Sequence, residues 1–221
     1  MSNLAVIPAR GGSTRLKNKN ITPLLGKPLI RWITSAVLES GCFDKVIIST
    51  DCNNIFDAVA DLNVERHIRP EHHATVSATV LDAMMDLMDE VETYNTFSYF
   101  LPTCPFISPD DILKGVQKLE QKQCDTVISM TQIPETVQLA CLMSEDNVLP
   151  VFDNLEWGIT NSKFIKKYYK PSGAFYMGLW NYLKENRNFF NRKTKGVIIP
   201  PSRSVDINTI EDIKYAESIA W

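Results

Sequence analysis

The sequence has no long apolar run, no paired cysteines and no excess of charge of one sign. No stretch approaches the roughly 18 apolar residues of a membrane-spanning helix, and the first residues show no signal-peptide pattern. The five cysteines are scattered without a CxxC pair, which argues against a disulfide framework or a zinc site. A net charge of only −3 indicates no nucleic-acid or membrane partner. We therefore expect a soluble cytoplasmic protein.

The length and the patterning of the chain indicate its fold class. A chain of 221 residues is long enough for one α/β domain and short for two. Strand-like runs alternate with helix-like segments, which predicts a mainly parallel sheet with helices on both faces. We expect strands near 4–7, 45–50, 64–68, 96–101, 125–130, 172–178 and 197–199, and helices near 30–38, 55–62, 78–90, from 109, and near 179–185.

Two later regions depart from this alternation. Residues 132–170 have mixed charge and little period, so we expect a single domain over 1–221 with an inserted arm there. The end of the chain is predicted as a short strand turning into a helix. Thr209 and Asp212 have the spacing of an acidic capping box for that helix.

The stretch IPARGGSTRLKNKN, residues 7–20, combines four basic residues with two adjacent glycines and has no acidic residue. It follows the first strand, and ligands of parallel sheets bind where strands end. Glycine amides and basic side chains are suited to phosphate. The pattern is neither GxxxxGK[ST] nor GxGxxG. From charge and spacing alone, a solvated basic loop is the alternative interpretation.

Several motifs in order carry a resemblance to a known family. The stretch IPARGGSTRLKNKNITPLLGKPLI closely resembles the N-terminal signature of sugar-acid cytidylyltransferases, especially the acylneuraminate (CMP-sialic acid synthetase) family. Later segments resemble further motifs of that family, so the resemblance covers almost the whole chain. They are VIISTD (46–51), RP (69–70), LPTCPF (101–106), YKPSGAFYM (169–177) and VDINTIEDIKYAE (205–217).

The resemblance implies a fold and a reaction. The fold would be a Rossmann-like, three-layer nucleotide-diphospho-sugar transferase fold with a mainly parallel sheet and a dimerisation arm that crosses to the partner of a homodimer. The reaction would join CTP and a 2-keto-3-deoxy sugar acid, giving the CMP-sugar and pyrophosphate, with Mg²⁺. Such chemistry depends on charge stabilisation and positioning more than on a protein nucleophile.

The resemblance also implies roles for single residues. Arg10 and Lys19 would be catalytic, holding the triphosphate and offsetting charge on the leaving pyrophosphate, with Arg15 and Lys17 as helpers. The cytidine portion would be held by Ala9, Gly11, Gly12, Asn20 and Arg69.

Asp206 matches the first aspartate of the family's DID motif and is the expected metal ligand, with Asn208 in the place of the second. An amide oxygen can still bind a metal or position a water, although the charge is lost. From the residues alone, Asp206 could equally cap a turn before the last helix.

The departures from the family pattern gather on the sugar side. Tyr176 matches a tyrosine that lines the sugar-acid site, the alternative being a half-buried strand aromatic. Leu101 stands where sialate enzymes often have glutamine. A substrate-binding arginine of the family is missing from the stretch around residues 161–163, and either Lys163 or Lys166 would take its place. The sugar acid, whether sialic, legionaminic, pseudaminic or related, therefore stays open.

Two rival functions remain. One is a non-catalytic homologue that binds nucleotide, and the other is a nucleotidyltransferase for another sugar and base. Cys104 has no His or Asn signature that would make it a nucleophile. His72 and His73 lack metal-ligand spacing with other His or Cys residues, and we expect both to be solvated loop residues.

Overall fold

A computed structural model describes residues 2–75, 77–122, 124–134, 137, 141–144, 147–151 and 167–220. The strands are β1 (Asn3–Pro8), β2 (Pro23–Leu24), β3 (Lys27–Pro28), β4 (Lys45–Thr50), β5 (Glu65–Ile68), β6 (Thr96–Phe100), β7 (Thr126–Gln132), β8 (Cys141–Ser144), β9 (Asn147–Pro150), β10 (Tyr169–Leu179) and β11 (Thr194–Ile198). The helices are α1 (Leu29–Glu39), α2 (Asn53–Asp57), α3 (Val80–Glu90), α4 (Pro109–Glu120), α5 (Trp180–Asn186) and α6 (Ile210–Ile219), with 3₁₀ turns η1 (Lys19–Ile21), η2 (Glu71–His73) and η5 (Pro201–Arg203).

One sheet organises the molecule, in the strand order β11-β7-β10-β6-β1-β4-β5. Every pairing is parallel except those of β10, which lies antiparallel between β6 and β7. The mainly parallel sheet is therefore confirmed. The chain runs from β1 to β4 and β5 on one side, and β6 then pairs with β1 on the other side. Because the strand order reverses there, the carboxyl ends of β1 and β6 form a switch point where ligands of such sheets bind.

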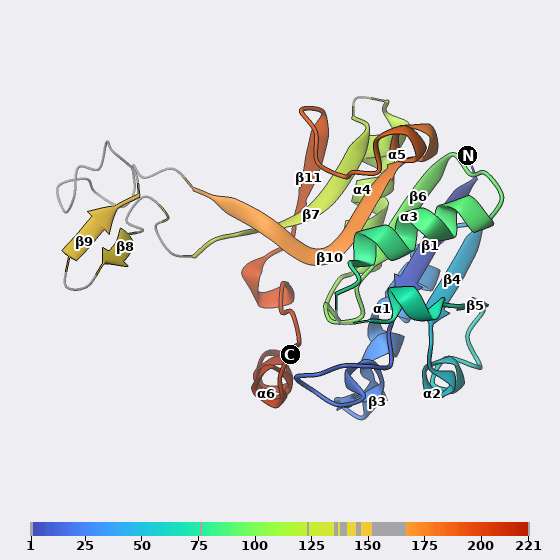
Figure 1. Ribbon diagram of the computed structural model, residues 1–221, viewed down its shortest axis with the longest axis horizontal. Helices are drawn as coiled ribbons and strands as arrows, with labels where there is room; N and C mark the ends of the chain where they lie inside the picture. Colours follow the sequence, from blue (N-terminus) through green and yellow to red (C-terminus); the bar gives the residue numbers. More distant parts are fainter. Residues whose placement is uncertain are drawn as a thin grey trace.

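Helices cover both faces of this sheet, as predicted. On one face α1, α2 and α4 pack on buried side chains such as Ile7, Ile48 and Phe175. On the other face α3 and α5 pack on residues such as Val6 and Phe97, and Figure 1 shows these two helices in front of the sheet. Leu4, Val6, Ala5 and Ile7 alternate between the two cores, so β1 is a fully buried central strand.

The last helix belongs to a separate small core beside β2 and α1. Ile213 and Ala216 of α6 pack with Leu24, Leu29 and Ile207, and Figure 1 shows α6 next to β3. The capping box of Thr209 and Asp212 is confirmed, with side-chain and backbone bonds in both directions. The short strand expected just before α6 is wrong. Residues 204–208 are not assigned to a strand, although the Ile207 amide donates to the Thr103 carbonyl at 2.8 Å.

The second helix ends earlier than the sequence predicts. The expected span was 55–62, but α2 covers Asn53–Asp57 and the chain continues in turns. Beyond Asp57 the amides of Val59, Ala60 and Leu62 donate to carbonyls three residues back, which is a turn pattern. Arg31 Nη1 donates to the Ala58 carbonyl at 2.9 Å and so binds these turns from outside. Arg31 also forms an ion pair with Asp61 at 2.6 Å, which stabilises the turn.

The segment between β7 and β10 contains the β8–β9 hairpin, which Figure 1 shows beyond the end of the sheet. Most of the remaining arm residues in the predicted range 132–170 lie outside the described part of the chain, so the arm and the single-domain boundary stay predictions. Within that part, no helix has the length and apolar character needed to cross a membrane. Where cysteine side chains are described, at 42, 52, 104 and 124, all are free thiols.

An ion pair between a buried carboxylate and a partly exposed arginine holds the segment that leads to Asp206. Asp111 caps α4 together with Ser108, and its side chain is only 3% exposed. Arg203 of η5 binds both of its carboxylate oxygens. Burial alone would raise the pKa of Asp111, but the hydrogen bonds from Arg203 and Ser108 outweigh it and hold that pKa below its ordinary value.

Replacing Arg203 with Met is expected to lower the free energy of unfolding by about 3 kcal/mol, because a buried carboxylate would lose its charged partner. Urea denaturation measures this change. Arg192→Met, at an exposed arginine, is the matched control and should change stability by less than about 0.5 kcal/mol. Equal stability of the two variants would show that the pair contributes no net stabilisation.

Candidate active site

A cleft of about 330 Å³ opens at the switch point, between the loop after β1 and the segment after β6. Three arginines, one lysine and one carboxylate line it among the described residues. Such an excess of positive charge in a concave site is suited to a polyanion. The charged lining consists of Arg10, Arg15, Lys19, Arg69 and Asp206.

The loop after β1 is held at both of its ends. The Ala9 amide donates to the Ser49 carbonyl at 2.9 Å. Asn20 is only 6% exposed, and its side-chain amide donates to the Arg10 carbonyl at 2.9 Å. Asn18 takes a left-handed conformation with φ of 55° and leads into η1, which directs Lys19 toward the cleft. The basic segment is thus a structured loop.

The two adjacent glycines of this loop serve different purposes. The Gly11 amide donates to Asp51 Oδ1 at 2.7 Å, so in this structure the amide is bound within the protein. A Cβ at residue 11 would lie 2.8 Å from the Cβ of Cys52, whereas one at residue 12 would meet nothing within 4 Å. Gly11 therefore permits a close approach of two backbones, while Gly12 is the more open of the two.

This difference predicts opposite outcomes for one substitution. Gly11→Ala should destabilise the protein by about 1–3 kcal/mol, because the new methyl group collides with Cys52. Gly12→Ala, the matched control, should change stability by less than about 0.5 kcal/mol. Thermal unfolding of both variants measures the effect, and equal melting temperatures would contradict the close packing at Gly11.

Arg10 joins the loop to a second wall of the cleft. Its Nη1 donates to the Thr75 carbonyl at 2.8 Å, and residues 78–80, just beyond, also line the cleft. Neither Asp51 nor this second wall is among the site residues expected from the sequence. A carboxylate directly after a buried strand was the signal that would have revealed Asp51. The carbonyl of Thr75 has no signal in the sequence, since every residue has one.

Arg69 is a buried cation with unused hydrogen-bonding capacity. It is 5% exposed, its Nη2 donates to the Ser49 carbonyl at 3.2 Å, and its Nε has no hydrogen-bond partner. Burial lowers the pKa of Arg69; Asp51 opposes this shift and Arg10 adds to it. A buried donor without a partner costs stability, so this guanidinium is prepared for an anion in the cleft.

Lys19 and Arg15 meet at the carboxyl-terminal wall. Lys19 Nζ donates to Asn208 Oδ1 at 3.1 Å, and Arg15 Nη2 donates to the same oxygen at 2.8 Å. Asn208 Nδ2 donates in turn to Asp206 Oδ2 at 2.8 Å. Burial lowers the pKa of Lys19; Asp206 opposes the shift, while Arg15 and Arg10 add to it. The ammonium is therefore short of negative charge.

The structure brings most of the expected site residues together. Those that line the cleft are Arg10, Arg15, Lys19, Asn20, Arg69, Leu101, Asp206 and Asn208. Ala9, Gly11 and Gly12 lie in the loop without lining the cleft, and Lys17 is exposed outside it. Lys163 and Lys166 lie outside the described residues.

Tyr176 lies in β10, partly buried and outside the cleft lining. Its ring stacks on Tyr99 with centroids 4.8 Å apart and also contacts Phe189. Burial raises the pKa of Tyr176, and Cys104 and Asp206 add to this shift. These contacts fit the half-buried strand aromatic that was the alternative interpretation. Cys104 is 1% exposed, and burial raises the pKa of its thiol, which does not suit a nucleophile.

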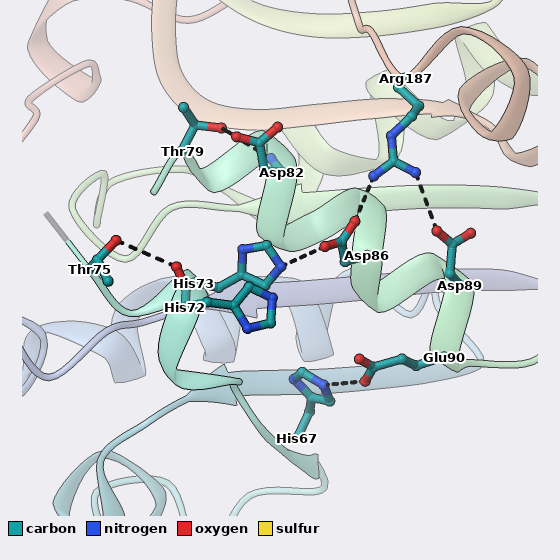
Figure 2. A network of polar contacts seen from close by, with 10 residues as sticks. All are labelled: His67, His72, His73, Thr75, Thr79, Asp82, Asp86, Asp89, Glu90 and Arg187. Atoms are coloured by element: carbon teal, nitrogen blue, oxygen red, sulfur yellow. Dashed lines mark hydrogen bonds and ion pairs between the residues drawn. The ribbon is translucent and has the colours of Figure 1, made fainter. Parts of the chain in front are cut away.

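The expectation that His73 is solvated is wrong, whereas His72 is exposed as expected. His73 is 8% exposed, and its Nε2 lies 2.7 Å from Asp86 Oδ2. Figure 2 shows Asp86 between His73 and Arg187, whose Nη2 donates to the other carboxylate oxygen at 2.7 Å. The donor atoms of His72, His73 and Asp86 lie within 4.8 Å of one another. Because both oxygens of Asp86 already have partners, we interpret this cluster as a brace between η2, α3 and α5.

Comparison with known proteins decides the family. The profile of the family described as "Cytidylyltransferase" matches residues 4–158, which is more than half of the chain. The chain belongs to the cytidylyltransferase family. The matched range includes the basic loop and the segment that carries Arg69, so the family assignment covers most of the cationic lining.

Several characterised cytidylyltransferases align with nearly the whole chain. The pseudaminic acid cytidylyltransferase of Campylobacter jejuni is 30% identical, over 98% of this chain and 95% of the relative. The CMP-N,N'-diacetyllegionaminic acid synthase of Legionella pneumophila is 31% identical, over 99% of this chain and 96% of the relative. The N-acylneuraminate cytidylyltransferase of Escherichia coli is 31% identical over 98% of this chain. The alignment covers 51% of that longer protein. These cytidylyltransferases are nucleotidyltransferases, and so is the present chain.

Solved structures confirm the Rossmann-like fold of a nucleotidyltransferase. A CMP:2-keto-3-deoxy-manno-octonic acid synthetase complexed with CTP superposes with a TM-score of 0.73 at 16% identity, covering 100% of this chain and 98% of that one. The 4-diphosphocytidyl-2C-methyl-D-erythritol synthase of Anaerococcus prevotii gives a TM-score of 0.69 at 15% identity, covering 99% of this chain and 98% of that one.

Proposed function

We propose that this cytidylyltransferase transfers CMP from CTP to a nonulosonic acid, a 2-keto-3-deoxy sugar acid, and releases pyrophosphate. The observation that carries the proposal is the convergence of four cations from the β1 loop and the end of β5 on one cleft at the switch point. The relatives that align over nearly the whole of both chains are named for pseudaminic and legionaminic acids, which supports this substrate class.

The reaction needs in-line displacement at phosphorus. The anomeric hydroxyl of the sugar acid attacks the α-phosphorus of CTP and gives up its proton to water. The bond from that phosphorus to the bridging oxygen breaks, and pyrophosphate leaves with the electron pair. Charge gathers on the leaving oxygens, so preorganised cations lower the barrier. Arg10, Arg15 and Lys19, which line the cleft, would stabilise this charge, and the buried Arg69 would hold the nucleotide.

The residues present fit a magnesium ion that arrives with CTP. Among the described residues that line the cleft, Asp206 provides the one carboxylate, and it is exposed. Magnesium commonly binds through one or two carboxylates together with substrate phosphates and water. Asp206 would hold the ion, which when bound would neutralise phosphate charge.

The sugar acid would lie on the side of Leu101, which lines the cleft, with Tyr176 and Lys163 as further expected contacts. The homodimer, its crossing arm and the cytoplasmic location stay predictions. The acceptor within this class stays open, because the relatives named for pseudaminic and legionaminic acids are 28–31% identical to this chain over 98–99% of its length.

Pyrophosphate release tests this function. The purified protein is incubated with CTP, Mg²⁺ and, in turn, pseudaminic, N,N'-diacetyllegionaminic, N-acetylneuraminic and 2-keto-3-deoxy-manno-octonic acid. Release that requires both CTP and one of these acids is the expected result. Binding of CTP without release for any acid would favour a non-catalytic homologue, and release from UTP or GTP with a sugar 1-phosphate would indicate another sugar and base.

Binding of CTP should weaken as the pH is raised through the pKa of Lys19. That pKa is lowered in the free protein, and a bound triphosphate favours the ammonium form, so binding takes up a proton in this range. Calorimetric titration with a non-hydrolysable CTP analogue between about pH 7 and about pH 10 measures the effect. The same pH dependence in Lys19→Met would show that another group is responsible.

A further inference from the structure

Asn208 has a contact for each end of its side-chain amide. Its Oδ1 accepts from Arg15 Nη2 at 2.8 Å and from Lys19 Nζ at 3.1 Å. Its Nδ2 donates to Asp206 Oδ2 at 2.8 Å. The neighbours settle which end of the amide is oxygen, because cations need an acceptor and a carboxylate needs a donor.

The backbone of Asn208 is fixed independently of these contacts. Its amide N–H donates at 2.8 Å to Asp212 Oδ2, in the first turn of α6. The neighbouring residue Ile207 is buried in the small core beside α6. The side chain is therefore presented to Arg15, Lys19 and Asp206 by a rigid support.

A carboxylate could not replace this amide in the same contacts. An ionised carboxylate accepts hydrogen bonds but donates none, so an aspartate at 208 would face Asp206 where the amide now donates. Two carboxylates that close together do not both stay ionised without a cation between them. An aspartate would also attract Arg15 and Lys19 as ion-pair partners, in competition with a triphosphate.

The amide oxygen is poorly available to a divalent ion. Two cationic donors already contact it, and both would repel Mg²⁺ at that position. Asp206 keeps a second carboxylate oxygen that does not contact Asn208. The metal donors of this wall are therefore reduced to one carboxylate.

We propose that Asn208 is a positioning residue and not a magnesium ligand: it holds Arg15 and Lys19 at the cleft and leaves Asp206 as the single protein carboxylate for the metal. Magnesium then binds this protein only together with the triphosphate, whose oxygens complete its ligands. The inference rests on the proposed use of CTP.

Binding of Mn²⁺, a paramagnetic probe for the magnesium site, tests the proposal without turnover. Water-proton relaxation is measured with and without a non-hydrolysable CTP analogue. The wild-type protein should show no saturable Mn²⁺ binding up to about 1 mM alone, and binding at least about tenfold tighter with the analogue. Asn208→Asp should gain binding that needs no nucleotide and bind the metal-free analogue more weakly.

Two further variants separate the effect of a negative charge at residue 208 from the loss of the side-chain contacts of Asn208. Asn208→Ala should weaken binding of the analogue without any gain in Mn²⁺ affinity. If Asn208→Asp does not fold, Asn208→Ala tests the proposal in its place. Asn63→Asp, at an exposed asparagine outside the cleft lining, adds the same charge and should behave as wild type.

The outcomes distinguish this inference from the proposed function. Mn²⁺ binding by the wild-type protein without nucleotide, lost in Asn208→Ala, would make Asn208 a ligand and overturn the inference alone. Failure of the wild-type protein to bind the CTP analogue at all would overturn the proposed function and this inference with it.

Discussion

Lys19→Met is expected to lower kcat/KM for CTP by about 10³-fold while the protein stays folded. The ammonium lies in the cleft at 3.1 Å from Asn208, and burial disfavours its charge in the free protein. A triphosphate supplies the missing negative charge, and the demand for that charge rises as pyrophosphate leaves. Loss of Lys19 therefore removes stabilisation where the transition state needs it most.

Initial rates of pyrophosphate release over a range of CTP concentrations measure this effect, with thermal unfolding as the check on folding. Lys114→Met, on the exposed side of α4, removes the same charge far from the cleft lining and should retain wild-type rates. A kcat/KM for Lys19→Met within a factor of about three of the control would remove Lys19 from the proposed machinery.

Arg69→Met is expected to weaken binding of a CTP analogue by about 10²-fold and at the same time to leave the protein equally or more stable. The guanidinium is 5% exposed, its Nε has no partner, and its one hydrogen bond among the described residues goes to the Ser49 carbonyl. Charged groups buried without full pairing cost stability, and an apolar side chain of similar length often replaces them without loss. Function and stability should therefore change independently.

Calorimetric titration and thermal unfolding of the same preparation measure both quantities. Arg66→Met is the matched control, because Arg66 is an exposed arginine of β5, three residues before Arg69. It should leave analogue binding unchanged. A less stable Arg69→Met protein with normal analogue binding would make Arg69 a structural residue and contradict its place in the site.

Much of the fold could be predicted because its signals are local. The buried strand at 4–7, the capping residues of α4 and α6, and the glycine with φ of 62° at residue 41 after α1 are all encoded within a few residues. The early end of α2 could not be predicted in this way. The turns that follow α2 are bound by Arg31, which lies 27 positions from Ala58 in the sequence.

In the candidate site too, features with local signals could be predicted, and contacts between distant residues could not. The cations of the loop after β1 could be identified because charge density is visible in the sequence. The bond from Arg15 to Asn208 joins residues 193 positions apart, so the sequence indicated a departure at 208 but not its partners. His73 was misjudged for the same reason, since its partner Asp86 comes from α3.

Phosphorus-31 NMR of one reaction tests the central claim most directly. The protein is mixed with CTP, Mg²⁺ and pseudaminic acid, and the other three acids are examined in parallel. We predict that, for at least one acid, the three CTP signals decrease while pyrophosphate and a CMP-sugar, which gives one phosphodiester signal, form in equal molar amounts. CTP that binds but keeps its signals unchanged with every acid would contradict the assignment of this cleft as a cytidylyltransferase active site.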